Sequence, residues 1–199
     1  MTAATPVVGV LALQGDFREH LAVLAELGVR GVPVRRASEL DQVDGLIIPG
    51  GESTVMDKLS RAFGLAEPLK ARIADGLPVY GTCAGLIFLA DRVLDAIDGQ
   101  QTLGGLDVAV RRNAFGNQLD SFETDLEVDG FEGPPVHAAF IRAPVVETVG
   151  ERATPLAALE DGRVVAVRQG NLLGTSFHPE ITGELRFHRA FLDTVVAAA

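Results

Sequence analysis

The sequence predicts an α/β fold, in which a doubly wound, mostly parallel sheet carries flanking helices and an antiparallel extension. Val7–Leu13 is a continuous apolar run of strand length, as expected for a central parallel strand buried on both faces. Strand-like and helix-like segments alternate over the first ninety residues, which is typical of a doubly wound sheet. The chain contains no evident repeat or linker, so we expect residues 1–199 to form a single domain.

The first half of the chain shows this alternation clearly. Asp16 is a candidate N-cap for the first helix, and Gly28 is a candidate residue to end it. A one-turn helix at most is expected near Ser38. Strands are expected over Val7–Leu13, Val29–Val34, Asp44–Ile48 and Leu77–Tyr80, and helices over Asp16–Leu27, from about Thr54, over about Ala66–Asp75 and over Ala84–Leu89.

The second half has a different pattern. From Phe122 to Val128, apolar or threonine side chains alternate with carboxylates, which predicts a half-exposed, antiparallel strand with a solvated acidic face. An amphipathic helix is expected to close the chain over Glu184–Ala198. Further strands are expected over Leu106–Arg111, Val136–Arg142, Pro155–Leu159, Arg163–Arg168 and Leu172–Phe177.

Composition excludes several classes of partner. The net charge of −10 argues against a nucleic-acid surface and against adsorption to an anionic membrane. A single cysteine cannot form an internal disulfide, which favours a reducing compartment. No signal peptide is visible, and no apolar run approaches the ~18 residues of a membrane span. We therefore expect a cytoplasmic protein.

The lone cysteine, Cys83, lies at a predicted strand-to-helix corner between Gly81 and Gly85. This is the spacing of a nucleophile elbow, with sulfur in place of a hydroxyl. The glycines would permit the backbone angles of a sharp turn and a close approach of the helix to the strand. A helix N-terminus would favour the thiolate. Taken alone, Cys83 fits a small buried core cysteine equally well.

His178 and Glu180 follow the last predicted strand. On an extended segment their side chains would point to one face, and Pro179 would keep the segment out of a helix. A carboxylate beside a histidine can fix its tautomer and stabilise its imidazolium form. Since the carboxyl ends of parallel strands converge on one crevice, Cys83 and this pair are expected to meet as nucleophile, base and orienting group.

Gly50 and Gly51 also follow a predicted strand, and they precede Glu52 and Ser53. A glycine pair between a strand and a helix exposes backbone N–H groups that could bind an oxyanion or a phosphate. A Walker-type lysine is missing, which weakens the phosphate interpretation. An ordinary βα turn is the alternative, and a nucleophile across the crevice favours an oxyanion hole.

These motifs together resemble a known family. Gly81-Thr-Cys-Ala-Gly85 and His178-Pro-Glu180 resemble the class I (triad) glutamine amidotransferases. Within that superfamily, the chain resembles the glutaminase subunits of pyridoxal 5′-phosphate synthase over nearly its whole length. The segments that carry this finer resemblance are Leu11-Ala-Leu-Gln-Gly15, Gly50-Gly-Glu-Ser-Thr54, Arg112-Asn-Ala-Phe-Gly116, Asp120-Ser-Phe-Glu123 and Ile141-Arg-Ala-Pro144.

The resemblance implies hydrolysis of L-glutamine to glutamate and ammonia, without cofactor or metal. It implies Cys83 as nucleophile, His178 as base and Glu180 as the group that orients His178. It also implies an oxyanion hole from the backbone N–H groups of Gly51 and Ala84, a synthase subunit as partner in a hetero-oligomer, and membership of both the hydrolase and the lyase classes. The residues implied to hold glutamine are Gly51, Glu52, Ser53, Arg112, Ile141 and Arg142.

Three other functions remain open on the sequence. One is a glutaminase that serves purine or histidine synthesis, which Gly50-Gly-Glu-Ser53 disfavours. Another is a non-catalytic module of the same fold, although such proteins usually lose a triad member. The third is a cysteine peptidase. The family often has arginine where this chain has Asn117, which affects the expected contacts of that loop but no step of the chemistry.

Overall fold

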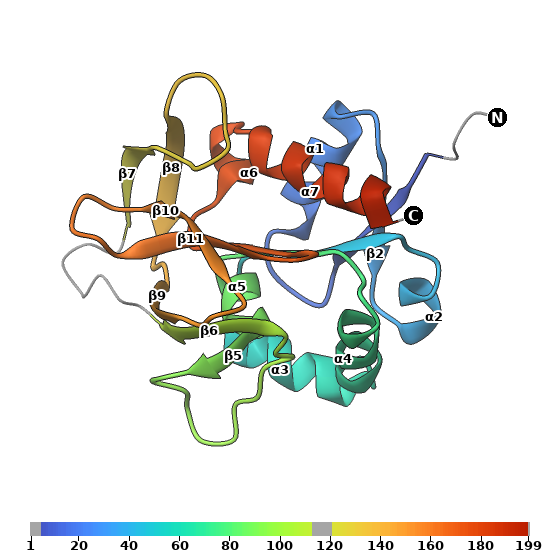
Figure 1. Cartoon of the computed structure of the whole chain (residues 1–199). Helices are drawn as coiled ribbons and strands as arrows, with labels where there is room; N and C mark the ends of the chain where they lie inside the picture. Colours follow the sequence, from blue (N-terminus) through green and yellow to red (C-terminus); the bar gives the residue numbers. More distant parts are fainter. Residues whose placement is uncertain (1–4, 113–120, 199) are drawn as a thin grey trace.

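The computed structural model describes residues 5–112 and 121–198, and shows helices packed on both faces of a 10-stranded sheet (Figure 1). The strand order is β2-β1-β3-β4-β12-β11-β9-β6-β5, with β10 paired to β11. The strands are β1 (Val7–Leu11), β2 (Arg30–Val34), β3 (Gly45–Ile48), β4 (Val79–Thr82), β5 (Ala90–Val93), β6 (Leu106–Arg111), β9 (Val145–Val149), β10 (Thr154–Ala158), β11 (Val164–Gln169) and β12 (Leu172–Thr175).

The predicted fold class is confirmed. Strands β2, β1, β3, β4 and β12 run parallel, and β12 pairs antiparallel with β11 to begin the extension. A separate antiparallel hairpin consists of β7 (Ser121–Leu126) and β8 (Val136–Ile141), and the outward side chains of β7 include the expected carboxylates Glu123 and Asp125. Two short strands, β5 and β9, were not predicted. β5 follows α5 with no residue between them, and β9 is a five-residue strand that begins directly after Pro144.

The helices divide between the two faces. In Figure 1, α1, α6 and α7 lie on one side of the sheet, and α3, α4 and α5 lie on the other. Among the helices of the described residues, none combines the length and apolar character needed to cross a membrane. The bounds are α1 (Phe17–Glu26), α2 (Ala37–Leu40), α3 (Ser53–Ala62), α4 (Ala66–Ala74), α5 (Ala84–Leu89), α6 (Pro179–Thr182) and α7 (Arg186–Ala198).

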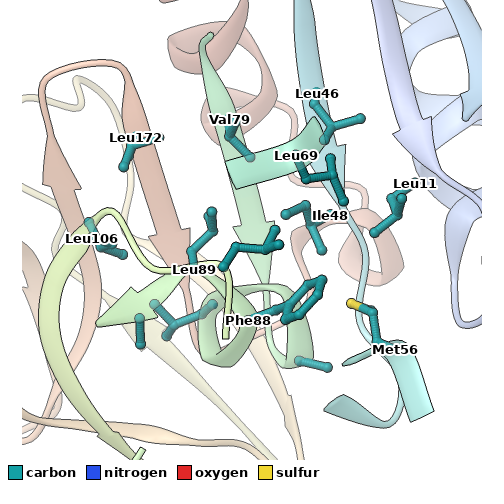
Figure 2. Close-up of a cluster of buried hydrophobic side chains, with 14 of the residues drawn as sticks. Leu11, Leu46, Ile48, Met56, Leu69, Val79, Phe88, Leu89, Leu106 and Leu172 are labelled. Atoms are coloured by element: carbon teal, nitrogen blue, oxygen red, sulfur yellow. The ribbon is translucent and has the colours of Figure 1, made fainter. Parts of the chain in front are cut away.

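Each face of the sheet has its own hydrophobic core. Figure 2 shows the cluster between the sheet and helices α3–α5, which includes Ile48, Val79, Phe88 and Met56. On the other face, Phe177, Phe187 and Phe191 join the hairpin β7–β8 to α7. Burying both faces explains why the central strands are almost wholly apolar.

Candidate functional site

The proposed site lies where β3, β4 and β12 end side by side. Gly51 follows β3, Cys83 follows β4 directly, and His178 lies three residues beyond β12. The Cys83 N–H donates to the Thr175 carbonyl at 2.8 Å, which ties the elbow to β12. A cavity of about 640 Å³ opens at this edge. Its lining residues are Asp16, Gly51, Glu52, Ser53, Thr54, Cys83, Ala84, Ile87, Ile97, Arg112, Ile141, Arg142, His178 and Ile181.

Cys83 is the residue that bears the backbone strain of the elbow. Its φ of 48° lies in the left-handed region, whereas Gly81 and Gly85 have ordinary φ values. The glycines serve close packing: a Cβ on Gly85 would lie 2.1 Å from the Ile48 carbonyl oxygen, and one on Gly81 would lie 2.6 Å from Gly85. The expectation that these glycines supply the unusual turn angles is therefore wrong, while the close approach is confirmed.

His178 is held on several sides. Its Nδ1 lies 2.7 Å from Glu180 Oε1, and its backbone N–H donates to the Ala139 carbonyl of β8 at 3.0 Å. The ring also lies close to the turn after β3, because a Cβ on Gly50 would come within 2.4 Å of its Cε1. Burial acts to lower the pKa of His178, but hydrogen bonding to Cys83 and Glu180 outweighs it and raises the pKa to about 10.

The segment after His178 is not extended, contrary to expectation. Pro179 occupies the first turn of the short helix α6, where its missing N–H is not needed, so it begins a helix here. Glu180 still contacts His178 Nδ1, although Glu180 now belongs to helix α6. It is buried and does not line the cavity.

Glu52 caps helix α3 and lies beside Arg112. Its carboxylate accepts hydrogen bonds from the backbone of Thr54 and Val55 and from the Thr54 hydroxyl. Arg112 Nη2 lies 3.3 Å from Glu52 Oε1. Partial burial acts to raise the pKa of the Glu52 carboxyl, but these hydrogen bonds and the Arg112 charge outweigh it and lower that pKa.

Ile141 and Arg142 reach the cavity from the end of β8. The Cys83 Sγ lies 3.9 Å from the Ile141 carbonyl oxygen. Arg142 has a φ of 44°, the second left-handed non-glycine backbone among the described residues, and its side chain is exposed. Most of the Arg112–Gly116 segment, as well as Asn117 and Asp120, lies outside the described residues.

The structure therefore brings together all the predicted site residues. Sequence analysis missed Asp16 as a cavity residue: its side chain makes no capping hydrogen bond, and its Oδ2 lies 3.8 Å from His178 Nδ1. Its position just beyond β1, at the same edge as Cys83, was the available signal. It also missed His20 and His188, which are buried behind Glu180 and carry no recognisable motif.

Known proteins are similar to this chain in sequence and in fold. Residues 10–197 match the model of the SNO glutamine amidotransferase family. The chain is 69% identical over 190 residues to pyridoxal 5′-phosphate synthase subunit PdxT of Clavibacter sepedonicus, covering 96% of this chain and 91% of that protein. It is 61% identical over 193 residues to the protein of the same name from Streptomyces coelicolor, covering 97% and 95%.

A solved structure agrees with these relatives. A crystal structure of a glutamine amidotransferase superposes with a TM-score of 0.89 at 48% identity, covering 94% of this chain and 98% of that one. The expected lyase class is wrong, because the matching family is one of glutamine amidotransferases and gives it no support. The chain belongs to the SNO glutamine amidotransferase family.

Proposed function

We propose that this chain hydrolyses L-glutamine to L-glutamate and ammonia, and that it delivers the ammonia to a pyridoxal 5′-phosphate synthase subunit. The observation that carries the proposal is the arrangement at the cavity, where a strained cysteine faces a buried histidine that is hydrogen bonded to a carboxylate. Relatives at 59–69% identity carry the name of the synthase subunit PdxT, which supports the second half of the proposal.

Cys83 is the proposed nucleophile. Its sulfur attacks the side-chain amide carbon of glutamine, and the carbonyl π electrons move to oxygen. His178 donates a proton to the departing nitrogen, and collapse of the tetrahedral intermediate releases ammonia and leaves a γ-glutamyl thioester. Water, deprotonated by His178, then attacks the thioester and releases glutamate and the thiolate. Glu180 orients the imidazole and stabilises its charged form.

The backbone N–H groups of Gly51 and Ala84 are the proposed oxyanion donors. Gly51 has a φ of 143°, which residues with a Cβ rarely adopt, and a Cβ there would lie 2.4 Å from Gln14 Nε2, so the Gln14 side chain would have to move. The Glu52 N–H donates to Gln14 Oε1 at 3.2 Å, which couples this turn to the segment before α1. A partner that moves this segment would reorient the donors.

The remaining proposed site residues hold the glutamine itself. Arg112 and Arg142 suit the α-carboxylate, since a guanidinium offers paired donors, and Glu52 suits the α-ammonium group. Gly51 and Ser53 offer polar groups on the β3 side, while Ile141 offers backbone and apolar surface on the β8 side. All of these residues line the cavity.

We propose further that residues 1–199 act as one glutaminase domain within a hetero-oligomer. The exposed side chains of Arg18, Glu19 and Glu26 on α1 give the partner a charged surface next to Asp16 at the cavity. Neither nucleic acid nor membrane is a proposed partner, given the net charge of −10. A free thiol at Cys83 suits a reducing location such as the cytoplasm.

The test is glutamate release during a titration with the synthase subunit. Because a free glutaminase would lose ammonia to water, we expect a low rate for the chain alone and a rise of severalfold or more at saturation. Binding is measured separately by sedimentation. A flat rate despite saturated binding would contradict activation by the partner, and a chain inactive with and without it would contradict the glutaminase assignment.

A further inference from the structure

Two fully buried histidines lie behind the site, His20 next to the carboxylate of Glu180 and His188 next to His20. His20 belongs to α1 and His188 to α7, and both side chains have zero solvent exposure. They come from distant parts of the sequence and meet beneath the edge of the sheet that carries the site. Neither lines the cavity, so neither can touch a substrate bound there.

The tautomers of the two histidines decide which nitrogen donates in each of their hydrogen bonds. His20 Nδ1 lies 2.9 Å from His188 Nε2, and His20 Nε2 lies 3.1 Å from Thr82 Oγ1 and 3.7 Å from Glu180 Oε1. A nitrogen lone pair facing a buried carboxylate 3.7 Å away would be repelled, so we assign the hydrogen to His20 Nε2, which donates it to Thr82 Oγ1 and turns its positive end toward Glu180. His20 Nδ1 is then the acceptor, and His188 Nε2–H donates to it.

Glu180 has few other partners. Its Oε1 meets His178 Nδ1, but its Oε2 has no hydrogen-bond partner within the described part of the chain. A buried carboxylate with one strong hydrogen bond depends on nearby dipoles for its position and charge. His20 stays neutral as a dipole, because burial, followed by the nearby His188 and His178, holds its pKa well below the usual value. Burial likewise lowers the pKa of His188 to about 4.

We propose that His20, oriented by His188, is a positioning residue that holds the Glu180 carboxylate in line with His178. The proposal rests on the proposed function of the same site and extends its series of polar contacts by two residues. The series runs from Cys83 through His178 and Glu180 to His20, which faces Glu180 at 3.7 Å, and to His188, which is hydrogen bonded to His20. His20 takes no part in bond making; it acts only through Glu180.

The first experiment measures kcat and KM of the complex with the synthase subunit. His20→Asn, which places its amide near the Nδ1 position, should lower kcat about tenfold and leave KM for glutamine unchanged, as expected for a lost contact to a charged group outside the pocket. His20→Gln, which keeps an N–H near the Nε2 position, should retain kcat within about threefold of wild type. His137→Gln, on the exposed face of the hairpin, is the matched control and should retain full activity.

The second experiment repeats the His20 substitutions in a Glu180→Gln background. If His20 acts through Glu180, it should cost little more there, because effects within one network are not additive. If the His20 substitution lowered kcat by the same factor in both backgrounds, the proposal would be overturned. A folded His20→Asn protein with the kcat of wild type would also overturn it. If His20→Asn does not fold, His188→Phe, which removes only the donor to His20, takes its place, and the same two outcomes decide.

The third experiment needs no turnover. Cys83 is the single thiol, so the rate of its alkylation by iodoacetamide across pH reports the cysteine–histidine pair directly. The charged or titratable groups around His20 are His178 and Glu180, His188 with Glu184 beyond it, Tyr80 beside His188, and Asp16 beside His178. When Glu180 is no longer held, the imidazolium is stabilised less, and the pH midpoint of alkylation should rise by about half a unit or more in His20→Asn.

An unchanged or lower midpoint would overturn the positioning role. This outcome is independent of the proposed function, because a chain without glutaminase activity could still show the rise, and an active glutaminase could fail to show it.

Discussion

The parallel half of the sheet and the strands beyond it contribute differently to the site. Cys83 and His178 follow neighbouring parallel strands and are buried. The Cys83 backbone is hydrogen bonded to β12, the His178 backbone is hydrogen bonded to β8, and the His178 ring lies close to Gly50. Arg112 follows β6 in the antiparallel extension, and Ile141 and Arg142 end β8 in the separate hairpin. Ile141 and Arg142 are exposed.

The difference suggests a division of labour. Cys83 and His178, which make and break bonds, are buried at the ends of parallel strands, whereas Arg112, Ile141 and Arg142, which help to hold the amino acid, come from the outer strands. Substitutions of Cys83 or His178 should therefore lower kcat, and substitutions of the arginines on the outer strands should raise KM. The following predictions test this comparison, from the largest expected effect to the smallest.

Cys83→Ala should lower kcat of the complex by roughly ten-thousandfold or more, because the step that forms the thioester is lost. The fold should persist, since an alanine fits the same buried position, and circular dichroism and partner binding check this. Labelling of the wild-type chain with a glutamine-like electrophile should modify Cys83 alone. Substantial turnover by the purified variant would exclude covalent catalysis by this residue.

His178→Asn should be nearly inactive, whereas Glu180→Gln should keep a measurable fraction of kcat, about one to ten per cent. The base moves the proton itself, while the carboxylate only orients and stabilises it. Single-turnover assays at several pH values make the comparison. Equal activity of wild type and His178→Asn would show that the base lies elsewhere.

Arg142→Gln should raise KM for glutamine about tenfold and leave kcat within about threefold, because it removes a charged donor that binds substrate and transition state alike. Arg152→Gln is the matched control, since Arg152 pairs with Asp91 and Asp107 and does not line the cavity. A fall in kcat at constant KM would contradict the division between the two regions.

The smallest expected effect concerns stability in acid. His188 has a folded pKa of about 4, below the value of about 6.5 in an unfolded chain, so the unfolded state binds the proton more readily. Its contribution to stability is complete above pH 6.5 and is lost as the pH falls toward 4, which amounts to about 2 kcal/mol at pH 5. The pKa of His20 is shifted in the same direction.

Urea unfolding at pH 7.5 and pH 5.0 measures this effect. The free energy of unfolding of wild type should fall over this range, and that of His188→Phe should fall less by about 2 kcal/mol. Identical pH dependence in the two proteins would show that His188 is not held neutral by the fold.

The sequence predicted much of this architecture for clear reasons. Val7–Leu11 and Gly45–Ile48 are apolar on both faces, a pattern that only a central parallel strand requires, and Phe122–Leu126 alternates as a one-sided strand does. The expected positions of Cys83 and His178 followed from the same logic, because residues beyond parallel strands meet at one edge. Local pattern failed at Pro179, which fits the first turn of a helix as well as an extended segment.

By itself, the sequence determined the fold class, the strand-to-helix corner at Cys83 and the set of candidate residues that meet at the cavity, with the exception of Asp16. Only the tertiary structure placed the strain on Cys83 rather than on its glycines, brought Asp16 beside His178, and buried His20 and His188 behind Glu180. The physical reason is the range of the interactions. Hydrophobic periodicity and turn chemistry act over a few residues and can be read along the chain. The His20–His188 contact joins residues 168 positions apart, and only the packing of α1 and α7 on one face of the sheet brings them together.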